Sequence, residues 1–186
     1  MEIFILRHGK PDFELKGMVK ANDLHLIAKN YNCSGVTDYP PQHKIEPLLD
    51  CNVVVCSDLA RSIQSAELLG VRSIHLTDSM FRESDIPYFS SGSIALPLSI
   101  WMLLLRILWF FGYSRNGESL ADAKIRSRVA TQQLVELARR HGKVLLVGHG
   151  MINHLIAREL LVNGWDGPRN PGKRYWQYGI YRYNVI

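Results

Sequence analysis

Ile3-Phe4-Ile5-Leu6-Arg7-His8-Gly9, near the start of the chain, joins four apolar residues to an arginine, a histidine and a glycine. Such an apolar run, with two β-branched residues and one aromatic, predicts a strand that is buried on both faces. Ligands of open α/β sheets bind beyond the carboxyl ends of the strands, so we expect Arg7 and His8 on the floor of a ligand crevice. Gly9 is expected to permit a tight turn and to bring backbone N–H groups close to the ligand.

Two later segments repeat this design of an apolar strand that ends in polar residues. Lys143-Val144-Leu145-Leu146-Val147-Gly148-His149-Gly150 places a second histidine at a predicted strand end. The run Cys51–Cys56 ends at Ser57-Asp58, and apolar residues at helical spacing then predict a helix over 59–69. Ser57 or Asp58 is the expected N-cap of that helix, and Arg61 lies in its first turn.

The remaining pattern extends this alternation of strands and helices. Helices are predicted over 22–32, from Ser119 to His141 and over 151–162, and strands over 73–77 and Trp176–Ile186. Repeated βα units predict an α/β three-layer sandwich, with a mostly parallel central sheet and helices on both faces. At 186 residues the chain is expected to form one domain, residues 1–186.

The composition is that of a soluble globular protein, with 47% hydrophobic and 21% charged residues. An odd count of three cysteines argues against a disulfide framework, and no secretory signal is recognised, so we expect a reducing, cytoplasmic location. The net charge of +5 favours an anionic ligand. Because the cations are dispersed along the sequence, no nucleic-acid partner is expected. The oligomeric state is left open.

Residues that suit phosphoryl chemistry follow several predicted strands. Arg7 and His8, Arg61, Glu83 and His149 can meet at one edge of the sheet. Guanidinium groups bind phosphate oxygens bidentately, and a neutral imidazole can attack phosphorus. These cations can neutralise the charge on a phosphoryl group without a metal, so we expect no metal and no cofactor.

Arg7-His8-Gly9, Ser57-x-x-x-Arg61, Glu83 and Gly148-His149-Gly150 occur in an order and approximate spacing that resembles the histidine phosphatase superfamily, the phosphoglycerate mutase-like proteins. The resemblance covers most of the chain. It implies the phosphoglycerate mutase-like fold and a small phosphorylated substrate.

The resemblance also implies a role for each matching residue. His8 would be the nucleophile that becomes phosphorylated, with its other ring nitrogen held by a backbone carbonyl. Arg7 and Arg61 would clamp the phosphoryl group, and His149 would donate a hydrogen bond to it. Glu83 would be the general acid and base.

The resemblance also concerns residues that neighbour these motifs. Gly9, Ser57 and Gly150 would lie beside the bound substrate. Asp85, two residues after Glu83, is the alternative general acid. Glu118-Ser119 resembles a Gly-Glu-Ser segment of the family; a helix start is favoured there over a substrate contact.

The chain departs from the family pattern in an apolar helical insertion or lid at about residues 86–115. The segment Ile94 to Tyr113 is strongly apolar, but Pro97 and Arg106 interrupt it, so no transmembrane span is expected. We expect it to form a buried helix that packs on the sheet and makes an apolar wall or lid over the site. An exposed patch for a membrane surface or a partner is the alternative.

These observations predict a metal-independent phosphatase, of the histidine acid phosphatase type, that hydrolyses a phosphate monoester through phospho-His8. The alternatives within enzymes are a phosphoglycerate mutase-type phosphotransferase and a protein phosphohistidine phosphatase. The non-enzymatic alternative is a phospho-ligand or membrane-associated binding module, which the intact set of arginines and histidines disfavours. The sequence does not name the physiological substrate.

Overall fold

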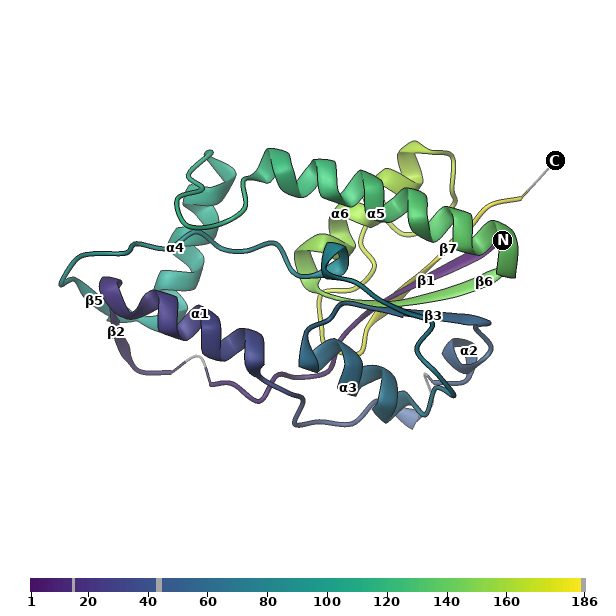
Figure 1. The fold of residues 1–186 in the computed structure, drawn as a ribbon, viewed down its shortest axis with the longest axis horizontal. Coiled ribbons are helices and arrows are strands. Elements are labelled where there is room, and N and C mark those ends of the chain that lie inside the picture. Colours follow the sequence, from purple (N-terminus) through teal and green to yellow (C-terminus); the bar gives the residue numbers. More distant parts are fainter. Residues whose placement is uncertain (15, 43–44, 185–186) are drawn as a thin grey trace.

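A computed structural model describes residues 1–14, 16–42 and 45–184 of the chain (Figure 1). Its strands are β1 (Glu2–Arg7), β2 (Met18–Lys20), β3 (Val53–Cys56), β4 (Leu76–Thr77), β5 (Ala95–Pro97), β6 (Lys143–Gly148) and β7 (Tyr178–Arg182). Its α-helices are α1 (Leu24–Cys33), α2 (Glu46–Leu49), α3 (Ala60–Leu69), α4 (Leu98–Phe110), α5 (Leu120–His141) and α6 (Gly150–Val162). The described residues also form the 3₁₀ turns η1 (Ala21–Asp23) and η3 (Ser79–Phe81).

The central sheet has five strands in the order β4-β3-β6-β1-β7. All neighbours are parallel except β7, which runs antiparallel to β1 at one edge. This confirms the predicted α/β fold with a mostly parallel sheet. The last strand is shorter than the predicted Trp176–Ile186, of which residues 185 and 186 lie outside the described part.

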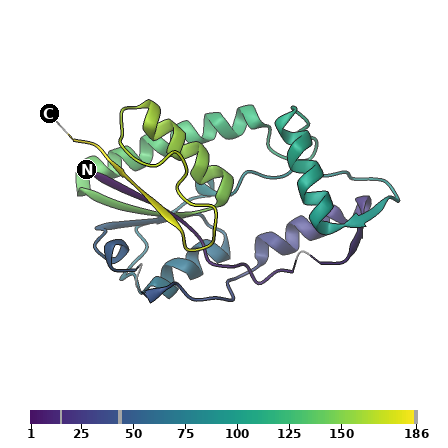
Figure 2. The same cartoon turned by 180° about the vertical axis from the view of Figure 1, so that it is seen from behind.

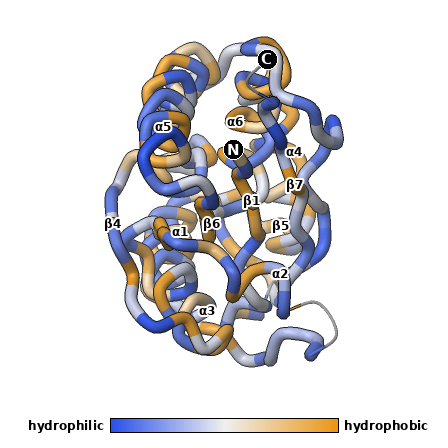
Figure 3. Tube along the Cα trace, turned by 90° about the vertical axis from the view of Figure 1, so that its right-hand side faces the viewer, coloured by the Kyte–Doolittle hydropathy of each residue, from blue (hydrophilic) through white to orange (hydrophobic). Residues whose placement is uncertain are grey.

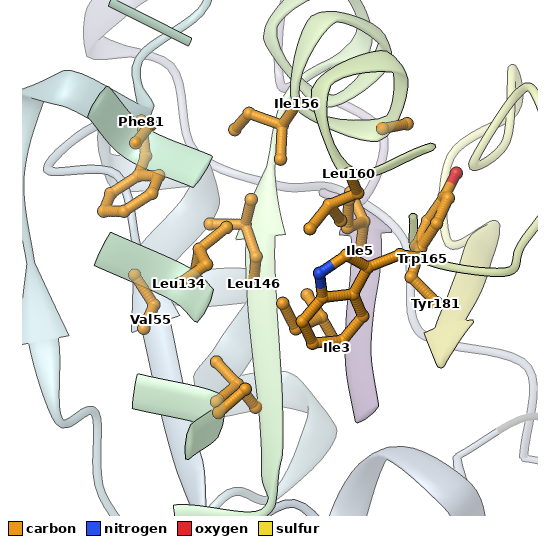
Figure 4. Packing of buried hydrophobic residues seen from close by; sticks show 14 of the residues in the cluster. Ile3, Ile5, Val55, Phe81, Leu134, Leu146, Ile156, Leu160, Trp165 and Tyr181 are labelled. Carbon is orange, nitrogen blue, oxygen red and sulfur yellow. The ribbon is translucent and has the colours of Figure 1, made fainter. Parts of the chain in front are cut away.

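Each central strand buries both faces, because helices cover the sheet on either side (Figures 1 and 2). Ile3 and Ile5 of β1 face α5 and α6, where they pack with Leu146, Leu134 and Ile156 (Figure 4). The alternate residues of β1, Phe4 and Leu6, face α2 and α3 on the opposite side. The hydropathy trace accordingly shows β1 and β6 as apolar along most of their length (Figure 3). The three layers arise from this period-two alternation.

A second, smaller group of elements lies to one side of the sheet, and we call η1, α1, β2, β5 and α4 the outer lobe (Figure 1). It has its own core, in which Leu24, Leu98, Trp101 and Leu105 are buried. The expectation that 94–113 packs on the central sheet is therefore wrong: α4 packs against α1 and the small β2–β5 sheet. The C-terminal part of α4 reaches the main body, where Trp109 contacts the helices α5 and α6.

The outer lobe also differs from expectation in its exposure. One face of α4 is buried, but the other exposes apolar side chains, with Leu103 64% and Phe111, just beyond the helix, 86% exposed. The described helices include none long and apolar enough to cross a membrane.

Helix starts were predicted with mixed success. Ser119 caps α5, where a helix start was expected with Ser119 or Asn116 as its cap: the Ser119 hydroxyl accepts a hydrogen bond from the Asp122 N–H at 3.0 Å. The expected cap of α3 is wrong, since Leu59 occupies the N-cap position without a side-chain bond. The Ser57 hydroxyl bonds to His149 and accepts from the Leu59 N–H at 3.4 Å, and Asp58 bonds to Arg82.

Candidate active site

The carboxyl ends of three neighbouring strands bring the predicted residues together. Arg7 ends β1 opposite Gly148 of β6, so His8 and His149 follow side by side, with ring centroids 4.8 Å apart. Strand β3 leads into α3, whose first turn carries Arg61. His8, Arg61 and His149 are almost completely buried. Parallel pairing of the strands therefore brings residues of these separate motifs to one edge of the sheet.

The imidazole of His8 is oriented by its own neighbour in the chain. Its Nδ1 lies 2.6 Å from the carbonyl oxygen of Gly9, which can only accept a hydrogen bond. Nδ1 must then carry the proton, which leaves the Nε2 lone pair available as a nucleophile. Burial, followed by the charge of Arg61 and to a smaller extent Arg7, lowers the pKa of His8 to about 3, although its bond to Gly9 opposes the shift. The ring is therefore neutral near pH 7.

His149 is held by Ser57, with 2.6 Å between His149 Nε2 and Ser57 Oγ. Its Nδ1 is buried and has no hydrogen-bond partner within the described chain. If the hydroxyl donates to Nε2, Nδ1 carries the proton and can donate to a ligand. Burial, then the nearby His8 and Arg61, lower the pKa of His149 well below its usual value, so this ring is also neutral.

Two arginines point cationic groups at the same place, each stacked on an aromatic ring. The Arg7 guanidinium lies 4.7 Å from the ring centroid of Tyr175, and that of Arg61 lies 4.4 Å from Tyr31. Backbone carbonyls anchor one nitrogen of each, Lys173 for Arg7 and Tyr31 for Arg61.

Donors remain free after this anchoring. Nε of Arg7, and Nε and Nη2 of Arg61, are buried without a partner in the ranges that the structure covers. Unsatisfied buried N–H groups are costly, so their presence beside two neutral histidines marks a site that is built for an anion.

Glu83 is positioned by the first turn of α6. Its carboxylate accepts hydrogen bonds from the N–H groups of Met151 at 3.0 Å and Ile152 at 3.1 Å. It is therefore attached to the helix that His149 introduces, as expected for a carboxylate at a helix N-terminus. Asp85, the alternative acid, has Glu118 and Arg126 as neighbours instead, and burial followed by the Glu118 charge raises its pKa.

Glu118 serves the structure around Glu83. It forms a bidentate pair with Arg126, at 2.7 and 2.6 Å. Arg126 also donates to the carbonyl oxygens of Met80 and Arg82, directly before Glu83. The helix start at Glu118-Ser119 thus fixes the segment that carries the carboxylate, and no substrate contact is needed to explain it.

Gly9 and Gly150, which directly follow the two histidines, differ in their surroundings. The Gly9 N–H donates to Ser65 at 2.9 Å, so it is not directed at a ligand, contrary to expectation. A Cβ at Gly9 would lie 2.4 Å from Trp176, so close packing rather than a left-handed turn requires glycine there. At Gly150 a Cβ would lie 3.5 Å from both Arg7 and Glu83, which places this glycine at the site itself.

Sequence reasoning missed three side chains at the site. Tyr31 and Tyr175 support the arginines, and no local motif indicates either tyrosine. Arg106 reaches inward from α4: its Nη1 is buried and finds no partner in the described chain, and its guanidinium interacts electrostatically with Glu83 and Tyr31. Burial lowers the pKa of Arg106. A lone arginine inside a strongly apolar helix was the available signal, because an unpaired buried charge is costly.

The described residues include no group of three or more His, Cys, Asp or Glu side chains that could hold a metal ion. The candidate site instead presents guanidinium and imidazole N–H groups, a carboxylate and one free imidazole nitrogen. This donor set suits a compact oxyanion such as a phosphoryl group.

Comparison with known proteins agrees with the fold. Solved structures that share the fold include mycobacterial hydrolase 1, at 20% identity over 99% of this chain and 97% of that one, with a TM-score of 0.60. Another is Bacillus stearothermophilus YhfR, at 17% identity over 96% and 89% of the two chains, with a TM-score of 0.63. A mycobacterial glucosyl-3-phosphoglycerate phosphatase matches at 21% identity over 87% and 79%, with a TM-score of 0.57.

A search of curated proteins gives no match. The sequence profile described as "Histidine phosphatase superfamily (branch 1)" matches residues 3–175, which include every predicted site residue. With nearly the whole chain matched by this profile, the protein belongs to the histidine phosphatase superfamily.

Proposed function

We propose that this protein is a metal-independent phosphomonoesterase that works through a phosphohistidine on His8. The observation that carries the proposal is the free Nε2 of a neutral His8, surrounded by unpartnered N–H groups of Arg7 and Arg61 and by Nδ1 of His149. Family membership supports the same reaction class.

In the first step, Nε2 of His8 attacks phosphorus and the bond to the ester oxygen breaks. Glu83 delivers a proton to that oxygen, which leaves as an alcohol. The two arginines and His149 stabilise charge on the equatorial phosphoryl oxygens, which is most of what such a transition state requires. The Nε2 lone pair of His8 now forms the N–P bond of phospho-His8.

In the second step, water attacks phospho-His8 while Glu83 takes its proton. The N–P bond breaks, inorganic phosphate leaves and His8 is neutral again. The hydrogen bond from Nδ1 to Gly9 stabilises the imidazole as it gains positive character in the first step and holds its orientation in the second. The outer lobe borders this centre through Tyr31 and Arg106, and we propose that it acts as the lid.

The test is hydrolysis of 4-nitrophenyl phosphate with and without a chelator, by wild type, His8→Ala and His25→Ala. We expect wild-type activity to survive chelation, and His8→Ala to lower kcat by roughly 10⁴-fold or more, as removal of a nucleophile does. His25 is exposed on α1 and provides a matched histidine control. Activity that requires added metal, or that persists in His8→Ala, would overturn the mechanism.

A quench experiment tests the intermediate directly. During turnover the wild type should carry a protein-bound phosphate that is labile in acid and stable in base, as phosphohistidine is, and His8→Ala should not. Transfer of this phosphate to a second phosphorylated acid rather than to water would indicate a mutase.

A further inference from the structure

A groove of about 500 Å³ adjoins the candidate active site and carries a set of cations that the proposed mechanism does not use. It lies along α6 and reaches α5, the end of α4 and the loop before Tyr175. Arg7 and Gly150 line the end nearest the catalytic centre. Lys124, Arg158 and Lys173 line the remainder, and we call this pocket the cationic groove.

The cations of this groove lack counterions. In the described part of the chain, neither Arg7 nor Lys124, Arg158 or Lys173 forms an ion pair. His154 lies among them, and its pKa is lowered, first by burial and then by the charges of Arg158 and Lys173. Mutual repulsion of uncompensated cations around a concave surface favours binding of an anion.

A second cavity provides a contrast. It measures about 620 Å³ and lies between α5, α6 and the C-terminal segment, among residues that play no part in the proposed chemistry. There Arg128 pairs with Glu159 at 3.5 Å and Arg139 with Glu136 at 3.9 Å. Each arginine of this cavity thus has a carboxylate partner, whereas Lys124, Arg158 and Lys173 of the cationic groove have none among the described residues.

The groove is also partly apolar. Phe110 from α4 and Leu155 from α6 line it together with the cations. Met151, Leu155 and Arg158 lie on one face of α6, at spacings of four and three residues. From Gly150 to Arg158 this face extends about 12 Å, at 1.5 Å per residue. A ligand that fills the groove therefore has an apolar section and a negative charge at some distance from Arg7.

We propose that the cationic groove binds the leaving group of the substrate, and that this leaving group carries a second anionic group, a carboxylate or a phosphate, beyond an apolar segment. The inference rests on the proposed function, since it assigns the phosphoryl group to His8 and Arg7. Arg7 is the shared residue: it holds the phosphoryl group at one end of the groove and thereby aligns the rest of the ester along α6. Lys124 and Arg158 are positioned to pair with the second anion.

Matched substrates test the charge requirement. The probes are 4-carboxyphenyl phosphate and 4′-carboxybiphenyl-4-yl phosphate, each compared with its neutral carboxamide. We expect wild type to prefer the carboxylate by at least about tenfold in kcat/KM for one length or both, mainly through KM, as one good charge-assisted contact would give. A preference below about twofold at both lengths would overturn the proposal.

Matched variants then locate the effect. Lys124→Gln/Arg158→Gln removes two charges from the groove, and we expect it to lower kcat/KM for each carboxylate to about the value for its carboxamide, which abolishes the preference. Arg128→Gln/Arg139→Gln removes two charges from the second cavity, and the preference should persist. If both double variants lose it equally, the general positive field of the protein is responsible and the groove is not a subsite.

Calorimetry separates this inference from the proposed function. It measures the binding of the corresponding aryl phosphonates, which cannot be hydrolysed. Charge-dependent binding without hydrolysis of any phosphate would support the groove and contradict the phosphatase. Hydrolysis without a charge preference in either assay would support the phosphatase and contradict the groove.

Discussion

The carboxyl edge of the central sheet and the outer lobe border the same site, but they are built on different principles. At the sheet edge, His8 and His149 are fixed by strand register, buried, and held by short hydrogen bonds to Gly9 and Ser57. In the outer lobe a short two-stranded sheet and two helices surround a small separate core. Its contribution to the site is the ring of Tyr31 and the guanidinium of Arg106.

This difference suggests a division of labour. Positioning within a few tenths of an ångström matters most for the reacting groups, and a register of six paired residues between β1 and β6 provides it. The outer lobe has no comparable constraint, so its surface can vary with the substrate while the chemistry stays the same. The largest expected effects of mutation therefore belong to the sheet edge and its attached carboxylate.

After the loss of His8, the loss of the Glu83 carboxylate is expected to reduce the rate most. Glu83→Gln removes the proton donor of the first step and the base of the second, and we expect it to slow hydrolysis of an alkyl phosphate by roughly 10²- to 10⁴-fold. Asp85→Asn is the matched control, because Asp85 faces Glu118 and Arg126. Steady-state rates decide between them; a greater loss in Asp85→Asn would reverse the assignment.

Substitution of one arginine in each region compares the sheet edge with the outer lobe directly. Arg61→Ala removes donors from the sheet edge and should lower kcat by roughly 10²- to 10³-fold, as loss of a preorganised donor does. Arg106→Ala removes the charge that α4 contributes and should act mainly on KM, with a smaller loss. Circular dichroism of both variants checks the fold. Equal losses of kcat would mean that the outer lobe takes part in the chemistry itself.

The buried histidines predict a specific pH dependence of stability. Their folded-state pKa values lie below the unfolded value of 6.5, for His8 at about 3. Between these limits the unfolded chain binds protons that the folded chain does not. The free energy of unfolding should therefore fall as pH falls below 6.5, and His8 alone should contribute roughly 1.4 kcal/mol per pH unit down to about pH 3.

Urea unfolding at pH 7 and pH 5 measures this dependence, and His8→Gln is the comparison. Between pH 7 and pH 5 the free energy of unfolding should fall less in the variant than in wild type. The difference is the contribution of His8. Equal losses in the two proteins would show that His8 is protonated in the folded state.

The exposed face of α4 gives the smallest expected effect, and its buried face provides the comparison. Leu103 is 64% exposed, so Leu103→Gln should change the free energy of unfolding by less than about 0.5 kcal/mol. Leu105, two residues on, is buried in the core of the outer lobe, and Leu105→Ala should cost about 2–5 kcal/mol. A substantial loss of stability in Leu103→Gln would mean that the apolar face of α4 is covered in solution.

The sequence was informative where one local pattern determines the structure. Buried runs such as Ile3–Leu6 specify central strands, and the residues after them are brought to one edge by parallel pairing, so the convergence of His8 with His149 was predictable. Capping residues were less certain, because Ser57 can satisfy either a helix end or a neighbouring histidine, and tertiary contacts decide which.

Other features depend on long-range packing and could not be predicted. Ile125 and Val129 have helical spacing, yet α5 exposes both and buries Leu134 together with small residues such as Ala130 and Ala138. The prediction that α4 is buried on the central sheet failed for a similar reason. An apolar composition does not show which face of a helix packs against the rest of the protein. Tyr31 and Tyr175 support arginines that lie far from them in sequence, and no periodicity indicates such pairs.

The contacts of β1 have a consequence for the order of folding. The Arg7 side chain donates to the carbonyl of Lys173, 166 residues away, and the N-terminal amino group donates to Tyr183, 182 residues away. The nucleophile is made early in synthesis, but β6 and the segment after residue 172 must be present before it is held in place. Such non-local pairing predicts slow folding, in which catalytic competence is among the last properties the chain acquires.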